Sequence, residues 1–381
     1  ETENTQRRAE KMRKKTGKIW IVGVLVCLLA VLLLPGGSMK TEAADSFCLI
    51  IGGKTYNTKE DITDDGWSYT AETNTLTLQG FSYTYYGEAY CANVISVNQD
   101  LNLVLEGVNT ITNDSKSDKT YDYRGIYVKG NLTISGDGSG YESLTVTSGG
   151  GGKKGNCYGI KVTGNLTIDN GEIVATGKAN GDSVGIYADG DITINGGTVK
   201  ATGNTAYSMA RTSKGIHCGG TYVQNGGDVA VTSNNDNSDS YGTGLCAGND
   251  ITITSGKLSA VGSLRSGNSK SSVGIKCSGI YTQTGGEVKA TSYNKYTGIY
   301  DKKLGLKAAG IKFEGNTLTL EGNTRAYEIT GRSDSEQTNE KNIAWTKASV
   351  LKASNFTITP PDGIYNGKEQ EVTVTPKEGI N

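Results

Sequence analysis

The chain has little proline, one histidine and almost no excess of charge. Its 381 residues contain four prolines, none of them between residues 36 and 359. Because proline cannot donate to a strand ladder, so long a stretch without it favours continuous sheet over a disordered tail. Removing residues 1–44 takes away 8 of the 38 basic and 4 of the 39 acidic residues, which leaves a net charge of −5. Because residues 45–381 carry no excess of basic side chains, their composition does not indicate a nucleic-acid partner.

The N-terminal segment predicts export. A basic run from Arg7 to Lys18 precedes the apolar residues 19–34. As a helix these sixteen residues would span about 24 Å, less than the roughly 30 Å hydrocarbon core of a bilayer. Residues 1–44 are therefore expected to be a signal peptide that is cleaved near Ala44, with an uncleaved membrane anchor as the alternative. The expected location is secreted or on the surface of a bacterium, with membrane contact only through this segment.

Glycine is abundant, with 54 copies, and many of them open a repeated phrase. The phrases are GIYVKGNLTI at Gly125, GIKVTGNLTI at Gly159, GIYADGDITI at Gly185, GIHCGGTYVQ at Gly215, GLCAGNDITI at Gly244, GIKCSGIYTQ at Gly274 and GIKFEGNTLTL at Gly310. A further copy without the glycine, VISVNQDLNLVL, starts at Val94. Units of this length can bury their apolar side only against neighbouring copies.

Each unit contains three short stretches in which apolar and polar residues alternate with a period of two. Stacked in parallel, they predict an all-β fold, a right-handed parallel β-helix of about eight three-strand coils. The signature of a leucine-rich horseshoe, the competing repeat fold, is absent. A short polar residue recurs at one turn in five of the coils, and these residues are expected to form a side-chain ladder: Asn131, Asn165, Asp191, Asp250 and Asn316.

The repeat also suggests the domain boundaries. Residues 45–93 are expected to form an N-terminal β cap, with a hairpin built from residues 67–69 and 75–78. The β-helix then covers residues 94–330, and residues 331–354 form a connector. Residues 355–381 contain two strands bounded by prolines, typical of the start of a β-sandwich module.

One column of the first strand is expected to face solvent. It contains Ser96, Tyr127, Lys161, Tyr187, His217, Cys246, Lys276 and Lys312. Tyrosine rings can stack on sugars and lysines can pair with uronate carboxylates. The candidate carbohydrate-binding residues are therefore Tyr127, Lys161, Tyr187, His217, Lys276 and Lys312. The alternative is that tyrosine and lysine simply coat a solvated sheet.

Neither catalysis nor a metal site is strongly indicated. His217 lies near Cys246, but no third group completes a catalytic set. The column contains no carboxylate, which disfavours a polysaccharide lyase or hydrolase. The loop around Asp236 and Asp239 offers calcium ligands, yet it lacks the terminal Glu of a complete calcium loop, so calcium is an optional cofactor and polar surface the stronger interpretation. Because the inward cysteines are two coils apart, most thiols are expected to be free.

Several phrases resemble one known family. These are GWSYTAETNTLTLQGF, DLNLVLEGVNTI, YGIKVTGNLTIDNGEIVATG and VGIYADGDITINGGTVKATG, within residues 46–330. They resemble a carbohydrate-binding family of exported proteins of Firmicutes with a right-handed parallel β-helix fold similar to pectate lyases. The resemblance implies polysaccharide binding at the cell surface, with calcium in some members. IYNGKEQEVTVTP also resembles the opening of bacterial immunoglobulin-like repeats.

Three functions are compatible with these observations. The first is a non-catalytic surface protein that binds an extended, acidic polysaccharide along one face of the β-helix. The second is a polysaccharide lyase or hydrolase on the same fold, and the third is an adhesin or spacer with protein partners. The sequence gives no indication of the oligomeric state.

Overall fold

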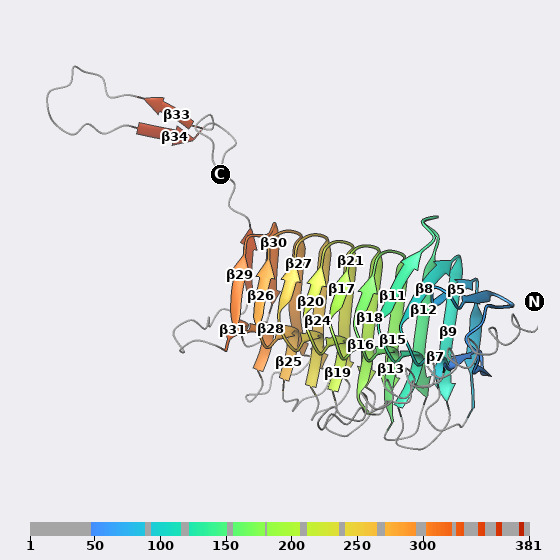
Figure 1. Ribbon diagram of the computed structural model, residues 1–381. Coiled ribbons are helices and arrows are strands. Elements are labelled where there is room, and N and C mark those ends of the chain that lie inside the picture. The colour runs from blue at the N-terminus through green and yellow to red at the C-terminus, as the bar shows by residue number, and fades with distance from the viewer. Residues whose placement is uncertain are drawn as a thin grey trace, which may run out of the picture. The chain divides into compact units, whose positions relative to one another are not determined.

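The computed structural model describes residues 47–87, 93–115, 122–150, 155–179, 181–205, 212–235, 241–264, 271–294, 302–321, 325–330, 342–346, 356–359 and 373–376. Within these residues the protein is all β and contains no helix. Three long sheets, which we name A, B and C, take their strands from the chain in rotation (Figure 1).

Each sheet collects strands from the whole length of the repeat. Sheet A contains β1 (Leu49–Ile51), β2 (Lys54–Tyr56), β7 (Asn93–Val97), β10 (Asp122–Val128), β13 (Asn156–Val162), β16 (Ser183–Ala188), β19 (Thr212–Cys218), β22 (Tyr241–Ala247), β25 (Ser271–Cys277), β28 (Lys302–Ala308) and β31 (Arg325–Ile329). Sheet B contains β3 (Ile62–Asp64), β4 (Trp67–Thr70), β5 (Thr75–Gln79), β8 (Leu101–Glu106), β11 (Leu132–Gly136), β14 (Leu166–Ile168), β17 (Ile192–Ile194), β20 (Tyr222–Gln224), β23 (Ile251–Ile253), β26 (Ile280–Gln283) and β29 (Gly310–Phe313). Sheet C contains β6 (Ser82–Tyr85), β9 (Val108–Ser115), β12 (Ser143–Gly150), β15 (Glu172–Ala179), β18 (Thr198–Thr205), β21 (Asp228–Asn235), β24 (Lys257–Leu264), β27 (Glu287–Asn294), β30 (Thr317–Glu321) and β32 (Asn342–Thr346).

Each coil supplies one strand to sheet A, one to sheet B and one to sheet C. In the described residues eight complete coils follow one another, from β7, β8 and β9 to β28, β29 and β30. Equivalent strands of successive coils pair in parallel, as β13 does with β10 and β16. The predicted parallel β-helix of about eight three-strand coils is confirmed.

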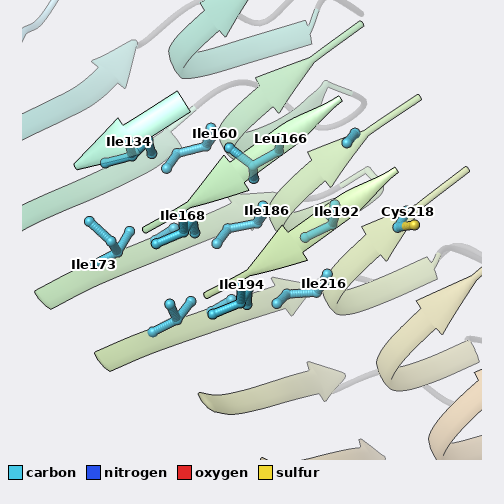
Figure 2. Packing of buried hydrophobic residues seen from close by; sticks show 14 of the residues in the cluster. Ile134, Ile160, Leu166, Ile168, Ile173, Ile186, Ile192, Ile194, Ile216 and Cys218 are labelled. Carbon is cyan, nitrogen blue, oxygen red and sulfur yellow. The ribbon is translucent and has the colours of Figure 1, made fainter. Parts of the chain in front are cut away.

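The core consists of columns of like residues stacked along the coils. Ile160 lies opposite Ile126 and Ile186 in sheet A, and each of the three side chains is fully buried. Figure 2 shows such stacks, with Leu166 and Ile192 among the residues of sheet B that face them. Full burial of one such side chain stabilises the fold by about 1.5–3 kcal/mol. Because every coil adds the same contacts, the hydrophobic core is continuous from coil to coil.

Six of the seven glycines that open a phrase lie where sheet A meets sheet C, and the seventh, Gly310, lies on β29 of sheet B. A Cβ atom on Gly185 would lie 2.5 Å from the backbone nitrogen of Thr202 and 2.8 Å from the carbonyl oxygen of Ala175. The same contact with a facing backbone recurs at Gly159, Gly215, Gly244, Gly274 and Gly305. At this corner the two sheets touch backbone to backbone, which only glycine permits.

The predicted polar ladder exists, but its hydrogen bonds run from backbone to side chain. The Oδ1 atom of Asn131 accepts a bond from the N–H of Asn165 at 2.9 Å, and Oδ1 of Asn165 accepts one from Asp191 at 2.8 Å. Asp250 accepts an equivalent bond from the N–H of Ile280 at 2.7 Å. The prediction is wrong for Asn316, which lies after the second strand and whose N–H bonds to the carbonyl of Gly286. Elsewhere in the ladder a side chain replaces the water that an exposed turn N–H would otherwise need.

Antiparallel strands lie at the N-terminal side of sheets A and B and at the C-terminal side of sheet C. At the N-terminal side β4 and β5 form the expected hairpin, with Tyr69 opposite Leu76, and β5 pairs in parallel with β8. At the other side β32 pairs antiparallel with β30, and its Trp345 ring lies 6.0 Å from that of Phe313 and 5.6 Å from that of Tyr327. Capping of this kind hides the apolar end of a solenoid.

Beyond the three long sheets, β33 (Phe356–Thr359) and β34 (Thr373–Pro376) form an antiparallel pair of their own. Among the described residues no helix is long and apolar enough to cross a membrane. The apolar segment 19–34 lies outside the described residues, so its role as signal peptide or anchor stays a prediction.

Candidate functional site

The predicted outward column is continuous over most of sheet A. Tyr127 lies opposite Lys161, Lys161 opposite Tyr187, and Tyr187 opposite His217. His217 is followed by Cys246 and then by Lys276 on the next two coils. The fold therefore brings five of the six candidate binding residues into one column, with one side chain per coil.

The sixth candidate, Lys312, was placed wrongly by the sequence. It lies on β29 of sheet B, opposite Thr282, and is not part of the column. Its place next to Lys276 is taken by Lys307, which is followed by Glu328. Two similar phrases succeed each other here, and only the first has the tight corner: a Cβ atom on Gly305 would lie 3.0 Å from the nitrogen of Glu321, whereas the nearest atom to one on Gly310 is a side-chain carbon at 3.8 Å.

An aromatic cluster occupies the middle of the column. The rings of Tyr158 and Tyr187 meet edge to face at 5.4 Å, and the Tyr187 ring lies 4.9 Å from the imidazole of His217. The ammonium group of Lys161 lies 4.5 Å from the centre of the Tyr158 ring and 5.2 Å from that of Tyr187. Such cation–π contacts hold the rings in fixed positions, as a stacking platform for a ligand requires.

Asp122 neutralises much of the positive charge around this cluster. Its Oδ2 atom accepts bonds from Arg124 at 2.6 Å and from Lys161 at 3.2 Å, and its Oδ1 atom accepts one from Asn156 at 3.0 Å. Burial raises the pKa of Asp122, but the two cations and the Asn156 bond outweigh burial and hold the pKa below its usual value. Lys161 is therefore paired with a carboxylate of its own chain, which reduces the charge that it presents to a ligand.

The hydroxyl of Tyr187 and the ring of His217 are both uncharged at neutral pH. Burial and a 2.8 Å hydrogen bond to Asp189 raise the pKa of Tyr187 to about 12. Burial, assisted by the charge of Lys214, lowers the pKa of His217 to about 4. Lys214 Nζ donates to Nδ1 of the imidazole at 3.3 Å. This part of the face offers polar, neutral rings to a ligand.

A positive charge lies further along the column, at Lys276. Lys276 is exposed and has no ion pair in the part of the chain that the structure describes. Lys307 in contrast is bound to Glu328 at 2.7 Å. Of the predicted lysines in the column only Lys276 thus has a charge available to an acidic ligand.

Sequence reasoning missed the residues that lie three positions before the column. Arg124 and Lys214 are partly exposed on the outer side of sheet A, and the Arg124 guanidinium lies 4.4 Å from the Tyr127 ring centre. Tyr158, which is 8% exposed, lies on the same side and contacts Tyr187 and Lys161. A strict period of two would place these side chains inside. The glycine and the next residue both point inward at the corner, which shifts the alternation by one position. The glycine itself was the signal that would have revealed them.

The remaining predictions concern cysteine and calcium. Cys48, Cys157, Cys218, Cys246 and Cys277 are free thiols, as expected. No group of three or more His, Cys, Asp or Glu residues that could hold a metal occurs among the residues described. Asp236 and Asp239 lie outside these residues, so the calcium loop stays a prediction.

Fold and face together define a parallel β-solenoid with an aromatic and cationic outer column. No protein-family model matches the chain, and neither the characterised proteins nor the solved structures include a match. The outer face itself is therefore the guide to function.

Proposed function

We propose that the protein binds an extended, acidic polysaccharide along the outer face of sheet A and does not cleave it. The observation that carries this proposal is the register of Tyr127, Tyr187, His217 and Lys276 on one face. Coils repeat about every 4.8 Å, so one protein group per coil suits a polymer that presents the same group repeatedly.

The two parts of the face have different roles in this proposal. Tyr127 and Tyr187 provide ring surface against which the apolar face of a sugar can stack. Lys161 acts indirectly, because its ammonium group fixes Tyr158 and Tyr187 while its charge is neutralised by Asp122. Lys276 supplies the charge that pairs with a uronate.

The sequence resemblance supports the wider setting of this function. It implies an exported, carbohydrate-binding protein of a Firmicute, secreted or held at the cell surface. In this proposal no cofactor is required, calcium being an optional ligand of the loop that contains Asp236 and Asp239. The partners are polysaccharides, and nucleic acids are not among them.

Replacement of Lys276 tests the proposal directly. Lys276→Ala is expected to weaken binding of a galacturonate oligomer about fivefold at low salt, as loss of a partly exposed ion pair of about 1 kcal/mol would. The difference should shrink at high salt, because screening weakens exposed pairs. Isothermal titration calorimetry at two salt concentrations measures both effects.

The matched control is Lys312→Ala, which removes the same side chain from a similar phrase on another sheet. It should bind like the unmodified protein. Equal affinity of Lys276→Ala and the unmodified protein would reject this face as the acidic site. Release of unsaturated or reducing sugar ends would instead indicate a lyase or hydrolase. Neither binding nor release would favour the adhesin or spacer.

A further inference from the structure

A hollow lies on the outer face of sheet C. Its volume is about 670 Å³, and its walls come from β18, β21, β24, β27 and β30. Small-molecule sites typically have volumes of about 300–1,000 Å³, so this hollow has room for several sugar rings. None of the residues in the sheet A column contributes to it.

The hollow exists because two small residues lie between two long ones in a single column. Lys200, Ala230, Ser259 and Lys289 are opposite one another on four successive strands. Ala230 and Ser259 are exposed and form the floor. Each lysine at the ends rises above this floor, which leaves a trough about two coils wide.

Ion pairs hold the two lysines away from the floor. Lys200 Nζ lies 2.8 Å from Glu172 on the preceding coil, and Lys289 Nζ lies 2.8 Å from Glu321 on the following coil. Glu321 also accepts a 3.1 Å hydrogen bond from Thr291. Both ammonium groups are thereby held away from the trough, towards the neighbouring coils, and the space between them stays open.

One side of the trough presents alternating charges. Asp228, Lys257 and Glu287 lie opposite one another on successive strands and are exposed. None of them has an ion pair within the described residues. The trough edge therefore offers an acceptor, a donor and an acceptor at coil spacing. Hydroxyl groups both donate and accept, and they fit such an edge.

We infer that this trough is a second binding site, for an uncharged oligosaccharide. Asp228 and Glu287 would repel an acidic chain, and Lys257 would repel a cationic one. The small side chains of Ala230 and Ser259 leave space for the apolar face of a sugar ring, while the hydroxyls of the sugar reach the charged edge. The inference does not depend on the proposed acidic site of sheet A.

The test uses cellotetraose, xylotetraose and mannotetraose as probes in calorimetric titrations of the full chain. At least one of them should bind the unmodified protein with little dependence on salt, because the ligand has no charge. Ala230→Tyr fills the trough and should weaken that binding at least tenfold. Lys257→Ala, which removes the central donor without adding bulk, should weaken it several-fold.

Two controls separate this site from other effects. Thr145→Tyr adds the same ring to the same outward column, three coils away, and should leave binding unchanged. Lys276→Ala should also leave it unchanged, since Lys276 belongs to sheet A. The inference is overturned if no tetraose binds, if Ala230→Tyr binds as tightly as the unmodified protein, or if only Lys276→Ala weakens binding.

Discussion

At the scale of single residues, glycine determines how closely sheets A and C approach. Gly185 has no room for a Cβ atom, because such an atom would lie only 2.5 and 2.8 Å from backbone atoms of sheet C. Gly310 has similar sequence neighbours, but a Cβ atom on it would have only a side-chain carbon nearby, at 3.8 Å. The two glycines open similar phrases and occupy different environments.

Substitution of these glycines should have unequal effects on stability. Gly185→Ala must push two backbones apart, and we expect it to lower the free energy of unfolding by about 1–3 kcal/mol. Gly310→Ala should change the free energy of unfolding by less than about 0.5 kcal/mol. Urea denaturation followed by circular dichroism compares the two variants. Equal losses would contradict the assignment of the tight corner to Gly185.

The single histidine gives a second prediction at this scale. His217 has its pKa lowered from 6.5 to about 4, first by burial and then by Lys214. Between pH 6.5 and 4 this histidine is protonated in the unfolded chain but stays neutral in the folded chain, which favours unfolding. The contribution of His217 to stability is therefore complete above pH 6.5 and is lost as the pH falls towards 4.

Nuclear magnetic resonance can measure this titration without assignment, because the chain has only one histidine. The imidazole proton shift should change with a midpoint near pH 4. In His217→Asn the decline in stability between pH 6.5 and 4 should be smaller than in the unmodified protein. A midpoint near 6.5 would show that the ring is solvated and not packed between Tyr187 and Lys214.

At the scale of elements, strands in the middle of a sheet pair their backbone N–H and C=O groups with both neighbours, whereas the last strand has one neighbour fewer. β32 covers the last parallel strand of sheet C, with five residues paired to β30. An uncovered parallel strand would present a row of free N–H and C=O groups to any other chain.

A truncation tests the role of β32. Deleting residues 342–381 removes this strand and should cause self-association that grows with concentration, because the edge of β30 becomes free. Deleting only residues 347–381 keeps β32 and should leave the oligomeric state of the unmodified protein. Light scattering after gel filtration measures both masses. The same mass for both variants would show that β32 does not protect the edge.

The success of sequence reasoning also differs from element to element. The strands that follow Gly159 and Gly185 could be predicted, since apolar residues alternate regularly and a glycine begins each phrase. The strand around Lys307 was missed because the next phrase, GIKFEGNTLTL at Gly310, is more similar in sequence to the other phrases. Arg124 and Tyr158 were missed because the glycine corner shifts the inside and outside positions.

At the scale of the solenoid, the three sheets present different outer surfaces. Sheet A has an aromatic cluster with Lys276 beyond it, and sheet C has a trough bordered by both signs of charge. The outer column of sheet B contains mainly threonines: Thr133, Thr167, Thr193, Thr252 and Thr282. The two chemically distinct surfaces therefore underlie the two separate binding sites that we propose.

The sequence by itself determined the repeating coil and most of its inward columns, because these depend on alternation within a few neighbouring residues. Only the tertiary structure decided which side chains share a surface. Asp122 contacts Lys161, 39 positions away in the sequence, and thereby neutralises the charge of that lysine. The trough likewise depends on Ala230 and Ser259 lying between two lysines of other coils. Contacts between coils follow from the register of the stack, which no single phrase contains.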